Sequence, residues 1–352
     1  MPIASQPDWL SADVVDLAAL ARWGQRHGLS GPIEQVDRIG GGTQNVVLRL
    51  SWGGRDLVLR RPPEHPRPGS DATIAREIRV LSALAGTDVP HPAFVAGCTD
   101  TDVLGVVFYL MEAVEGDHPG TAVGEPYRGD PDARRAAALD TATALARLHA
   151  VDHEAIGLGE LGRPAGFLER QVPRWLDHLA SYERVPGYPG HRLPHVPELA
   201  RWLEAHRPAQ SRAGLVHGDY HLNNLLLDPV TPRVAAIVDW EMCTVGDPLL
   251  DLGWLLVTWP EGPEPLAGAA FAALGGLPGT DELVAAYARR SDRDLSAVGW
   301  YTVLAGFKLA IVIEGTHARS FAGQADPEVG AHLHHAAVDR LTHVARLAGL
   351  GD

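Results

Sequence analysis

The segment that decides the fold spans residues 216–224 and reads Val-His-Gly-Asp-Tyr-His-Leu-Asn-Asn. It places Asp219 two residues after His217 and five residues before Asn224. A carboxylate can accept the proton of a hydroxyl group, and an amide oxygen is a suitable ligand for Mg²⁺. A loop of this length turns the side chains of Asp219 and Asn224 toward one point, and His217 can brace it by hydrogen bonds to the backbone. The segment therefore predicts hydroxyl chemistry beside a metal ion.

The spacing of these three residues is typical of the catalytic loop of a kinase. The alternative interpretation is an ordinary polar turn before a strand. A second motif favours the kinase, because the apolar run 234–238 leads directly into Asp239, fifteen residues beyond Asn224. Kinases place a metal-binding aspartate at such a strand end, whereas a lone aspartate there is more often structural. We therefore predict that Asp219 and His217 are catalytic and that Asn224 and Asp239 bind Mg²⁺.

A glycine-rich turn at residues 40–45 lies between two expected strands and reads Gly-Gly-Gly-Thr-Gln-Asn. Backbone N–H groups in such a turn can surround phosphate oxygens, although a plain hairpin turn is the alternative. The turn is neither a Walker A loop nor a dinucleotide-binding fingerprint, because neither a Gly-Lys-Ser/Thr sequence nor a helix follows it. The candidate phosphate-binding residues are Gly41, Gly42, Thr43 and Gln44.

The strand after this turn carries a cation. Strand alternation puts Val58 and Arg60 on one face. A kinase keeps its phosphate-contacting lysine at this place, but the only lysine of the chain is Lys308, so an arginine must fill the role. Glu77, on the following helix, is the expected ion-pair partner of Arg60. The alternative is that both are solvated surface charges.

Composition narrows the class of protein. The chain has 352 residues, 45% of them hydrophobic, and a net charge of −14, which makes nucleic acid or an anionic membrane an unexpected partner. The start of the chain lacks the features of a signal peptide, and we see no apolar run of the roughly 18 residues that a membrane span needs. Cys98 and Cys243 form no metal or disulfide pattern and are expected to be small buried hydrophobes. We expect a cytoplasmic protein.

Periodicity predicts an α+β architecture. A helix at residues 9–27, capped by Ser11, precedes an antiparallel sheet of about five strands with one helix. A second part is mostly helical and begins with a helix whose N-cap is Asp130. We expect a β-rich lobe at residues 1–113 and a helical lobe at residues 114–352. The expected strands are 36–39, 46–50, 57–60, 94–98, 106–112, 225–227 and 234–238, and the expected helices include 71–85, 131–150 and several within 247–350.

Three strings of sequence carry a resemblance to a known family. They are the catalytic-loop segment, Ile-Val-Asp-Trp-Glu at 237–241 and Gly-Asp-Pro-Leu-Leu-Asp-Leu at 246–252. From about residue 39 to 350 the chain resembles the aminoglycoside phosphotransferases, which have the bilobal protein-kinase-like fold. It most resembles the branch that is fused to acyl-CoA dehydrogenases, through residues 57–63, 240–256 and 306–315.

The resemblance implies a Mg-dependent kinase that moves the γ-phosphoryl of ATP or GTP to a hydroxyl of a small molecule. The nucleotide would lie between the lobes, with its adenine against the backbone of Glu112 to Val114. Asp219 would be the base, and Asp251 would tie the loop to the helical lobe. The chain departs from the family pattern near Gln44, where a serine is expected.

The acceptor stays open between a hydroxyacyl-CoA and an aminoglycoside-like alcohol. Arginines would favour an anionic acceptor and acidic residues a polyamine, and the alternative is that these are surface charges. Of the seventeen histidines, only His217 is assigned a role. The others show no HExxH or similar metal spacing. The candidate acceptor-binding residues are Arg170, Arg174, Trp175, Glu241, Glu314 and Arg319, with His317 nearby.

Two further hypotheses compete with this one. A catalytically silent pseudokinase would bind nucleotide without transferring phosphate, and the missing lysine speaks for it. The intact set of Asp219, Asn224 and Asp239 speaks against it. A choline- or homoserine-type kinase of the same fold is the other. The sequence predicts no oligomeric state.

Overall fold

In the computed structural model of the chain, residues 15–39, 45–63, 66, 68–209, 211–260 and 265–350 are described. The glycine-rich turn with Gly41, Gly42, Thr43 and Gln44, and the first part of the expected N-terminal helix, lie outside these residues. Contacts divide the chain into two compact units. Unit 1 comprises residues 1–116 and 235–241, and unit 2 comprises residues 117–234 and 242–352.

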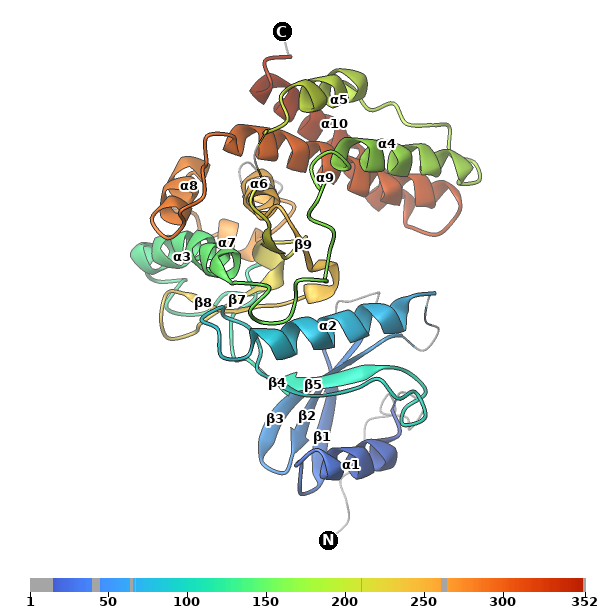
Figure 1. Cartoon of the computed structure of the whole chain (residues 1–352), viewed down its shortest axis with the longest axis vertical. Coiled ribbons are helices and arrows are strands. Elements are labelled where there is room, and N and C mark those ends of the chain that lie inside the picture. The colour runs from blue at the N-terminus through green and yellow to red at the C-terminus, as the bar shows by residue number, and fades with distance from the viewer. Residues whose placement is uncertain are drawn as a thin grey trace. The chain divides into compact units, whose positions relative to one another are not determined.

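Unit 1 contains a five-stranded antiparallel sheet in the order β1-β2-β3-β5-β4 (Figure 1). The five-stranded antiparallel sheet predicted from the sequence is confirmed. Helix α1 begins after Asp16, whose carboxylate caps it by accepting from the Ala19 N–H at 2.9 Å. The elements are α1 (Leu17–Arg26), β1 (Ile33–Arg38), β2 (Val46–Trp52), β3 (Arg55–Arg61), α2 (Ser70–Leu84), β4 (Phe94–Cys98) and β5 (Phe108–Glu112).

Successive side chains along β3 point to opposite faces of this sheet, and the two faces have different surroundings. Leu57 and Leu59 are fully buried in a core that also contains Trp23 of α1. Arg60 points to the other face, where it meets the buried Glu77 of α2. One face of the sheet therefore forms the hydrophobic core of the unit, and the opposite face carries a charged group.

Unit 2 is mostly helical, as Figure 1 shows. Its short strands β6 and β9 pair antiparallel. The unit boundary falls within strand β8, because Val234 belongs to unit 2 and the rest of the strand to unit 1. The remaining elements are α3 (Pro131–Ala150), α4 (Gln171–Ser181), α5 (Val196–Ala205), β6 (Gly214–Val216), β7 (Leu225–Leu227), β8 (Val234–Ile237), β9 (Thr244–Gly246), α6 (Leu249–Thr258), α7 (Ala269–Ala272), α8 (Thr280–Ala288), α9 (Val298–Phe321) and α10 (Pro327–Leu347).

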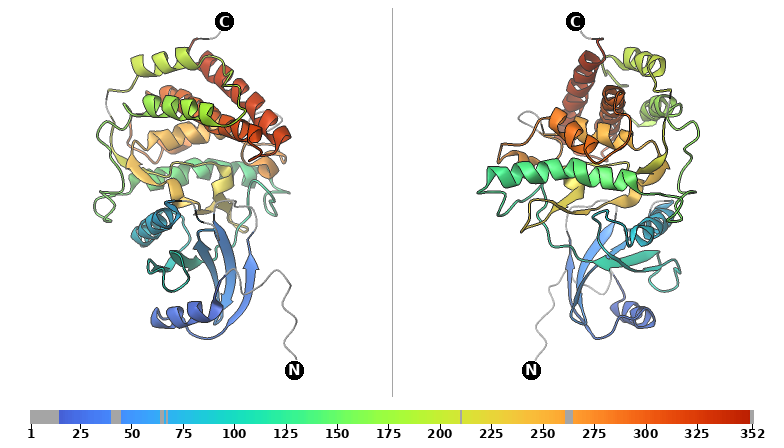
Figure 2. Two further views of the ribbon diagram at one scale, coloured as in Figure 1. Left: turned by 90° about the vertical axis from the view of Figure 1, so that its right-hand side faces the viewer. Right: turned by 60° about the vertical axis from the view of Figure 1, so that its left-hand side comes forward.

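Helix α9 is the central helix of unit 2 and packs against α6 and α10 (Figure 2). By length and composition it could cross a membrane, which corrects the expectation that no apolar stretch is long enough. However, 72% of its apolar window is buried inside the structure. A largely apolar helix that is covered by neighbouring helices is what the core of a large unit requires. We therefore interpret α9 as the core helix of unit 2.

The two cysteines are buried and form no disulfide. Cys98 ends β4, and its thiol lies 3.3 Å from the carbonyl oxygen of Asp100. Cys243 is fully buried just before β9. The prediction that both behave as small buried hydrophobes is confirmed.

Helices α6 and α9 approach closely at Gly253, and this contact can be tested by Gly253→Ala. A Cβ at this position would lie 2.5 Å from the carbonyl oxygen of Tyr301, so the backbone of α9 would have to shift. Overpacking of this kind lowers the free energy of unfolding by about 1–3 kcal/mol. Chemical denaturation followed by tryptophan fluorescence measures the change.

The matched control is Gly299→Ala in α9. A Cβ there meets nothing within 4 Å in the described part of the chain. Because alanine restricts the unfolded chain, this variant should gain roughly 0.4–1 kcal/mol. Equal stability of the two variants would contradict the close approach of α6 and α9.

Candidate active site

The predicted catalytic loop connects β6 to β7 and contains a short 3-10 turn at Leu222–Asn224. Gly218 has a φ of 91°, in the left-handed region that favours glycine. A Cβ at Gly218 would also lie 2.8 Å from both the Cβ and the carbonyl oxygen of Met242. Glycine is therefore required here both by its backbone conformation and by the close approach of the chain after residue 241.

Asp251, in the first turn of α6, holds this loop by hydrogen bonds to its backbone. Its Oδ2 accepts from the N–H of His217 at 2.6 Å, and its Oδ1 accepts from the N–H of Gly218 at 2.9 Å. The carboxylate is 1% exposed, and its Oδ2 also lies 3.4 Å from Nε2 of the buried His149. Burial lowers the pKa of His149. The role that the resemblance implied for Asp251, tying the loop to the helical part, is thus visible in the structure.

Asp219 is surrounded by three hydrogen-bonding groups within unit 2. Its Oδ1 accepts from Trp254 Nε1 at 3.0 Å and lies 3.3 Å from His221 Nε2. Its Oδ2 accepts from Asn224 Nδ2 at 3.0 Å. The Asp219 N–H in turn donates to His217 Nδ1 at 3.3 Å. The carboxylate is therefore fixed in position before any substrate arrives, as a group that must meet a hydroxyl requires.

The charge of Asp219 is fixed by the same neighbours. Burial raises the pKa of this carboxyl group, but the hydrogen bond from His221 and the nearby positive charges, including Lys308, outweigh burial and hold the pKa well below its usual range. Asp219 is therefore ionised at neutral pH. An ionised carboxylate can accept a hydrogen bond from a hydroxyl group and orient it.

Asn224 and Asn223 have different partners. The NH₂ group of Asn224 donates to both the carbonyl oxygen and the carboxylate of Asp219, at 2.9 and 3.0 Å. These bonds use the nitrogen, so Oδ1 is the atom of Asn224 that can act as a metal ligand. The Oδ1 of Asn223 accepts from the Gly268 N–H at 2.8 Å. Asn223 therefore anchors the chain, and Asn224 is the one available for a ligand.

Lys308 belongs to this site and was not recognised from the sequence. It lies on α9, is 7% exposed, and donates from Nζ to the carbonyl oxygen of Gly218 at 2.9 Å. The Nζ is 4.1 Å from the ring centroid of Trp254 and 5.6 Å from that of Trp175. Burial lowers the pKa of Lys308, and the negative charges of Asp219 and Asp251 oppose that effect. The cation thus contacts both the loop backbone and the tryptophan that binds Asp219.

One signal in the sequence pointed to Lys308. It is the only lysine of the chain and interrupts an apolar helix. A buried charge is retained only where partners compensate for the loss of water. The identity of those partners depends on contacts across ninety residues of chain, which periodicity does not reveal.

A second cluster of charges lies in unit 1. Arg60 Nε is 2.9 Å from Glu77 Oε2, and Glu77 Oε2 also accepts from the hydroxyl of Tyr109 at 2.7 Å. Burial raises the pKa of Glu77 to about 7, although Arg60 and Tyr109 both act to lower it. The predicted pairing of Arg60 with Glu77 is present. Because Glu77 is fully buried and the Arg60 side chain is 13% exposed, neither is a solvated surface charge.

The segment 235–241 adds two carboxylates to this cluster. Arg60 Nη2 donates to Asp239 Oδ1 at 2.7 Å and lies 3.4 Å from Glu241 Oε2. Asn45 Nδ2 donates to the same oxygen of Glu241 at 3.3 Å. Asp239 has a φ of 65°, a conformation that non-glycine residues rarely adopt and that is concentrated at functional sites. Arg60 therefore joins the predicted metal-binding aspartate to the charged pair of the sheet.

Three other residues predicted to bind nucleotide, Val58, Glu112 and Val114, also lie in unit 1. Val58 is buried and pairs across strands with Met111 of β5. Glu112 forms an ion pair with Arg55, and its backbone N–H donates to the Ala93 carbonyl at 2.8 Å. Val114 is half-buried in the segment after β5.

The predicted acceptor-binding residues separate into different environments. Arg170 is exposed and donates to the carbonyl oxygens of Arg163 and Ala165, at 2.5 Å each. Arg174 is exposed, with Cζ 5.4 Å from the ring centroid of the buried Trp175. Trp175 contacts Lys308, so this part of α4 belongs with the catalytic loop.

Three acidic or basic candidates lie elsewhere. Glu314 is fully buried and accepts from the hydroxyl of Tyr188 at 2.6 Å. Arg319 is exposed and donates to Thr316 Oγ1 at 2.9 Å. Glu241 lies in unit 1 beside Arg60. Within unit 2, neither Glu314 nor Arg319 forms a hydrogen bond or ion pair with Asp219 among the described residues.

Comparisons with known proteins also indicate a phosphotransferase. Residues 35–289 match the model of the phosphotransferase enzyme family. Over 305 residues the chain is 31% identical to acyl-CoA dehydrogenase family member 10 of Mus musculus, covering 84% of the chain and 27% of that protein. It is 30% identical over 196 residues to the aminoglycoside 3'-phosphotransferase of Streptomyces ribosidificus, covering 55% of the chain and 68% of that protein.

Solved structures resemble most of the chain. A protein of Ralstonia eutropha, described as a candidate aminoglycoside phosphotransferase, is 31% identical with a TM-score of 0.79, over 96% of this chain and 99% of that one. Aminoglycoside 2'-phosphotransferase-IIIa, solved as a GDP complex, shares the fold at 18% identity with a TM-score of 0.63, over 92% of this chain and 97% of that one.

A β-rich unit with a charged sheet face and a helical unit with an ordered catalytic loop define a protein-kinase-like phosphotransferase. The chain belongs to the phosphotransferase enzyme family. The predicted enzyme class, a small-molecule kinase with a hydroxyl acceptor, is confirmed. The predicted resemblance to the part fused to acyl-CoA dehydrogenases is also confirmed, although the chain spans only 27 to 38% of the length of those relatives.

The support of the loop by Asp251 can be tested with Asp251→Asn. The amide replaces one of the two accepting oxygens with an NH₂ group, which cannot accept from the backbone N–H that this oxygen binds, so a buried donor loses its partner. We expect the free energy of unfolding to fall by about 1–3 kcal/mol, measured by urea denaturation. Asp177→Asn, at an exposed position of α4, is the control. A midpoint equal to that of the control would show that the two bonds do not stabilise the fold.

Proposed function

We propose that the chain transfers the γ-phosphoryl group of ATP or GTP to a hydroxyl of a small, non-cationic molecule, with hydroxylated acyl-CoA as the leading candidate. The observation that carries the proposal is the position of the Asp219 carboxylate, which is held by Trp254, His221 and Asn224. Fixing such a group before the substrate binds is the main contribution that a protein makes to phosphoryl transfer.

Asp219 accepts a hydrogen bond from the hydroxyl of the acceptor and aims its oxygen at the γ-phosphorus. The oxygen forms its bond to phosphorus as the bond to the leaving nucleoside diphosphate breaks, and the hydroxyl proton passes to Asp219. Most analyses give this reaction a loose transition state with little bond formation to the nucleophile. A carboxylate with a low pKa is then sufficient, because the proton leaves only after the nucleophile has been oriented.

Arg60 takes the position of the usual lysine and would contact the phosphates. Its guanidinium has several donors in a fixed plane, so it can keep its bond to Glu77 while presenting others to phosphate oxygens. The buried Glu77, braced by Tyr109, supports such a role. This arrangement favours an active enzyme over a nucleotide-binding pseudokinase, because a silent site has no need of an oriented cation.

Asn224 and Asp239 would hold Mg²⁺. An amide oxygen and a carboxylate are hard oxygen ligands, and a nucleotide supplies phosphate oxygens for the remaining positions. When bound, the ion would neutralise negative charge on the phosphates. The unusual backbone of Asp239 supports a functional rather than a purely structural aspartate.

The charges near Asp219 favour an acceptor that is not a polyamine. Lys308 and Arg174 contact the ring of Trp175, so positive charge gathers beside the loop. The buried Nε1–H of Trp175 has no hydrogen-bond partner among the described residues, so it can donate a hydrogen bond to the phosphoryl acceptor. Glu314, the candidate that would favour a cationic acceptor, is buried away from solvent. An anionic acceptor such as a hydroxylated acyl-CoA fits these charges, and the similarity to acyl-CoA dehydrogenase family members supports it.

An aminoglycoside is the second candidate. The similarity to an aminoglycoside 3'-phosphotransferase of Streptomyces ribosidificus supports it. A choline- or homoserine-type acceptor has only the shared fold in its favour, and the cation of Lys308 beside the loop disfavours a quaternary amine.

Acceptor-dependent release of ADP or GDP tests the proposal. The wild type is assayed with Mg²⁺ and each nucleotide against hydroxyacyl-CoAs, aminoglycosides, macrolides and small alcohols. Asp239→Asn is the paired variant, because asparagine tolerates the left-handed backbone while removing the charge. We expect release with a hydroxyacyl-CoA and a loss of at least about 100-fold in the variant, the scale of one electrostatic group in an active site.

Release with aminoglycosides instead would reassign the acceptor and leave the kinase intact. Binding of nucleotide without release on any acceptor would favour the pseudokinase. Equal release by the wild type and Asp239→Asn would contradict the metal-binding role.

The proposed role of Arg60 in binding phosphate can be tested with Arg60→Lys. A lysine presents all its donors from one nitrogen, whereas Arg60 contacts Glu77 from Nε and the other two carboxylates from Nη2. Loss of one hydrogen bond to a charged group corresponds to roughly 10–100-fold in affinity. We therefore expect weaker binding of Mg-ATP by this factor in calorimetry. Arg76→Lys, exposed on α2, should bind as the wild type does, and unchanged binding by Arg60→Lys would contradict the role.

A further inference from the structure

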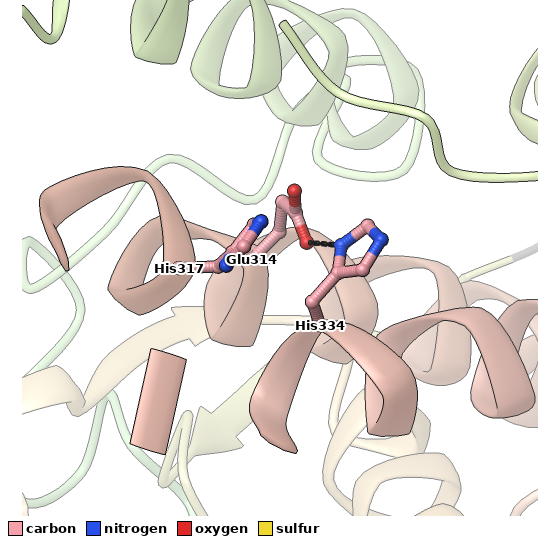
Figure 3. Close-up of side chains that lie close together, drawn as sticks. All are labelled: Glu314, His317 and His334. Carbon is pink, nitrogen blue, oxygen red and sulfur yellow. Dashed lines mark hydrogen bonds and ion pairs between the residues drawn. The ribbon is translucent and has the colours of Figure 1, made fainter. Parts of the chain in front are cut away.

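Two histidines and a glutamate meet where the end of α9 faces the start of α10. Glu314 and His317 lie one turn apart on α9, and His334 comes from α10 (Figure 3). One potential ligand atom from each residue lies within 4.8 Å of the others. Residues three apart on a helix share a face, so the backbone itself places the first two together. None of these residues takes part in the phosphotransfer chemistry proposed above.

Glu314 is the buried centre of this cluster. Its side chain is 0% exposed, which makes an ionised carboxylate costly unless charges or hydrogen bonds compensate. One oxygen, Oε1, accepts from the hydroxyl of Tyr188 at 2.6 Å. The other, Oε2, is 2.7 Å from Nδ1 of His334. Tyr188 thus orients the carboxylate and leaves Oε2 facing the imidazoles.

His317 supplies the second imidazole of the cluster. Its Nδ1 is buried and has no hydrogen-bond partner within the described residues. Its ring stacks on that of His334, with centroids 4.6 Å apart, and Phe321 packs against it at 5.1 Å. A buried nitrogen without a partner costs free energy, and a metal ion would satisfy it.

We propose that Glu314, His317 and His334 bind one divalent transition-metal ion of the Zn²⁺ type. Two imidazoles and one carboxylate on one side of an ion form a common protein site that leaves positions for water or another ligand. The Tyr188 hydroxyl is the kind of outer partner that orients a ligating carboxylate. Nitrogen ligands distinguish this site from Asn224 and Asp239, whose oxygens suit Mg²⁺.

Binding would connect three segments of unit 2. Glu314 and His317 hold the end of α9, His334 holds α10, and Tyr188 belongs to the stretch between α4 and α5. Because the ligands come together only in the folded unit, a bound ion adds its binding free energy to stability. The competing explanation is that Glu314 and His334 form a buried carboxylate–imidazole pair that needs no metal.

Calorimetric titration with Zn²⁺ distinguishes the two explanations. The chain is used without a polyhistidine tag, after treatment with a chelator and dialysis. The variants are His317→Gln and His334→Gln, which remove one ligand each. His335→Gln is the matched control, because His335 is the next residue on α10 and is exposed.

We expect one Zn²⁺ per chain in the wild type and in His335→Gln, with affinity weaker by at least about tenfold in each ligand variant. Thermal unfolding should show the same pattern, with a rise in Tm on addition of Zn²⁺ for the wild type and the control alone. Absence of stoichiometric binding to the wild type would overturn the proposal. So would binding of equal strength in the wild type and both ligand variants, which would place the ion on other histidines.

Discussion

The carboxylate of Asp251 carries the interaction on which the candidate active site depends. By accepting two successive backbone N–H groups of the loop, it fixes the chain at Gly218, where glycine alone tolerates the backbone and the contact with Met242. The Gly218 carbonyl then faces Lys308. Since Asp251 is buried in α6, three residues before the Trp254 that binds Asp219, one turn of helix positions both the loop backbone and the side chain of Asp219.

Much of the fold and part of the site followed from local patterns. The strands alternate visibly, and Phe94–Cys98 and Leu225–Leu227 were predicted to the residue. Proximity within a short loop also sufficed to group Asp219 with Asn224. What could not be predicted depends on distant contacts: Lys308 reaches back ninety residues to the loop. The segment 235–241 belongs by its contacts to unit 1, although the expected lobes followed the chain without a break.

Arg60 stands where a kinase usually has a lysine, and it contacts several carboxylates. A lysine would present its donors from one nitrogen, whereas the guanidinium of Arg60 contacts Glu77 from Nε and both Asp239 and Glu241 from Nη2. Alternation placed Arg60 on one face of the sheet, and Glu77 was the expected partner because it lies on the following helix. It could not predict Glu241, which was expected near the acceptor, because that contact spans 181 residues. The charges around Arg60 are thus balanced as a group and not as separate pairs.

The central claim is that Asp219, ionised and held in place, receives the hydroxyl proton of the acceptor. The most direct measurement is the rate of acceptor-dependent nucleoside diphosphate release by Asp219→Asn, with Asp177→Asn as the control. Loss of a positioned base lowers turnover by about 10²–10⁴-fold, and we predict a decrease of this size with nucleotide binding retained. Turnover equal to that of the wild type would contradict the claim.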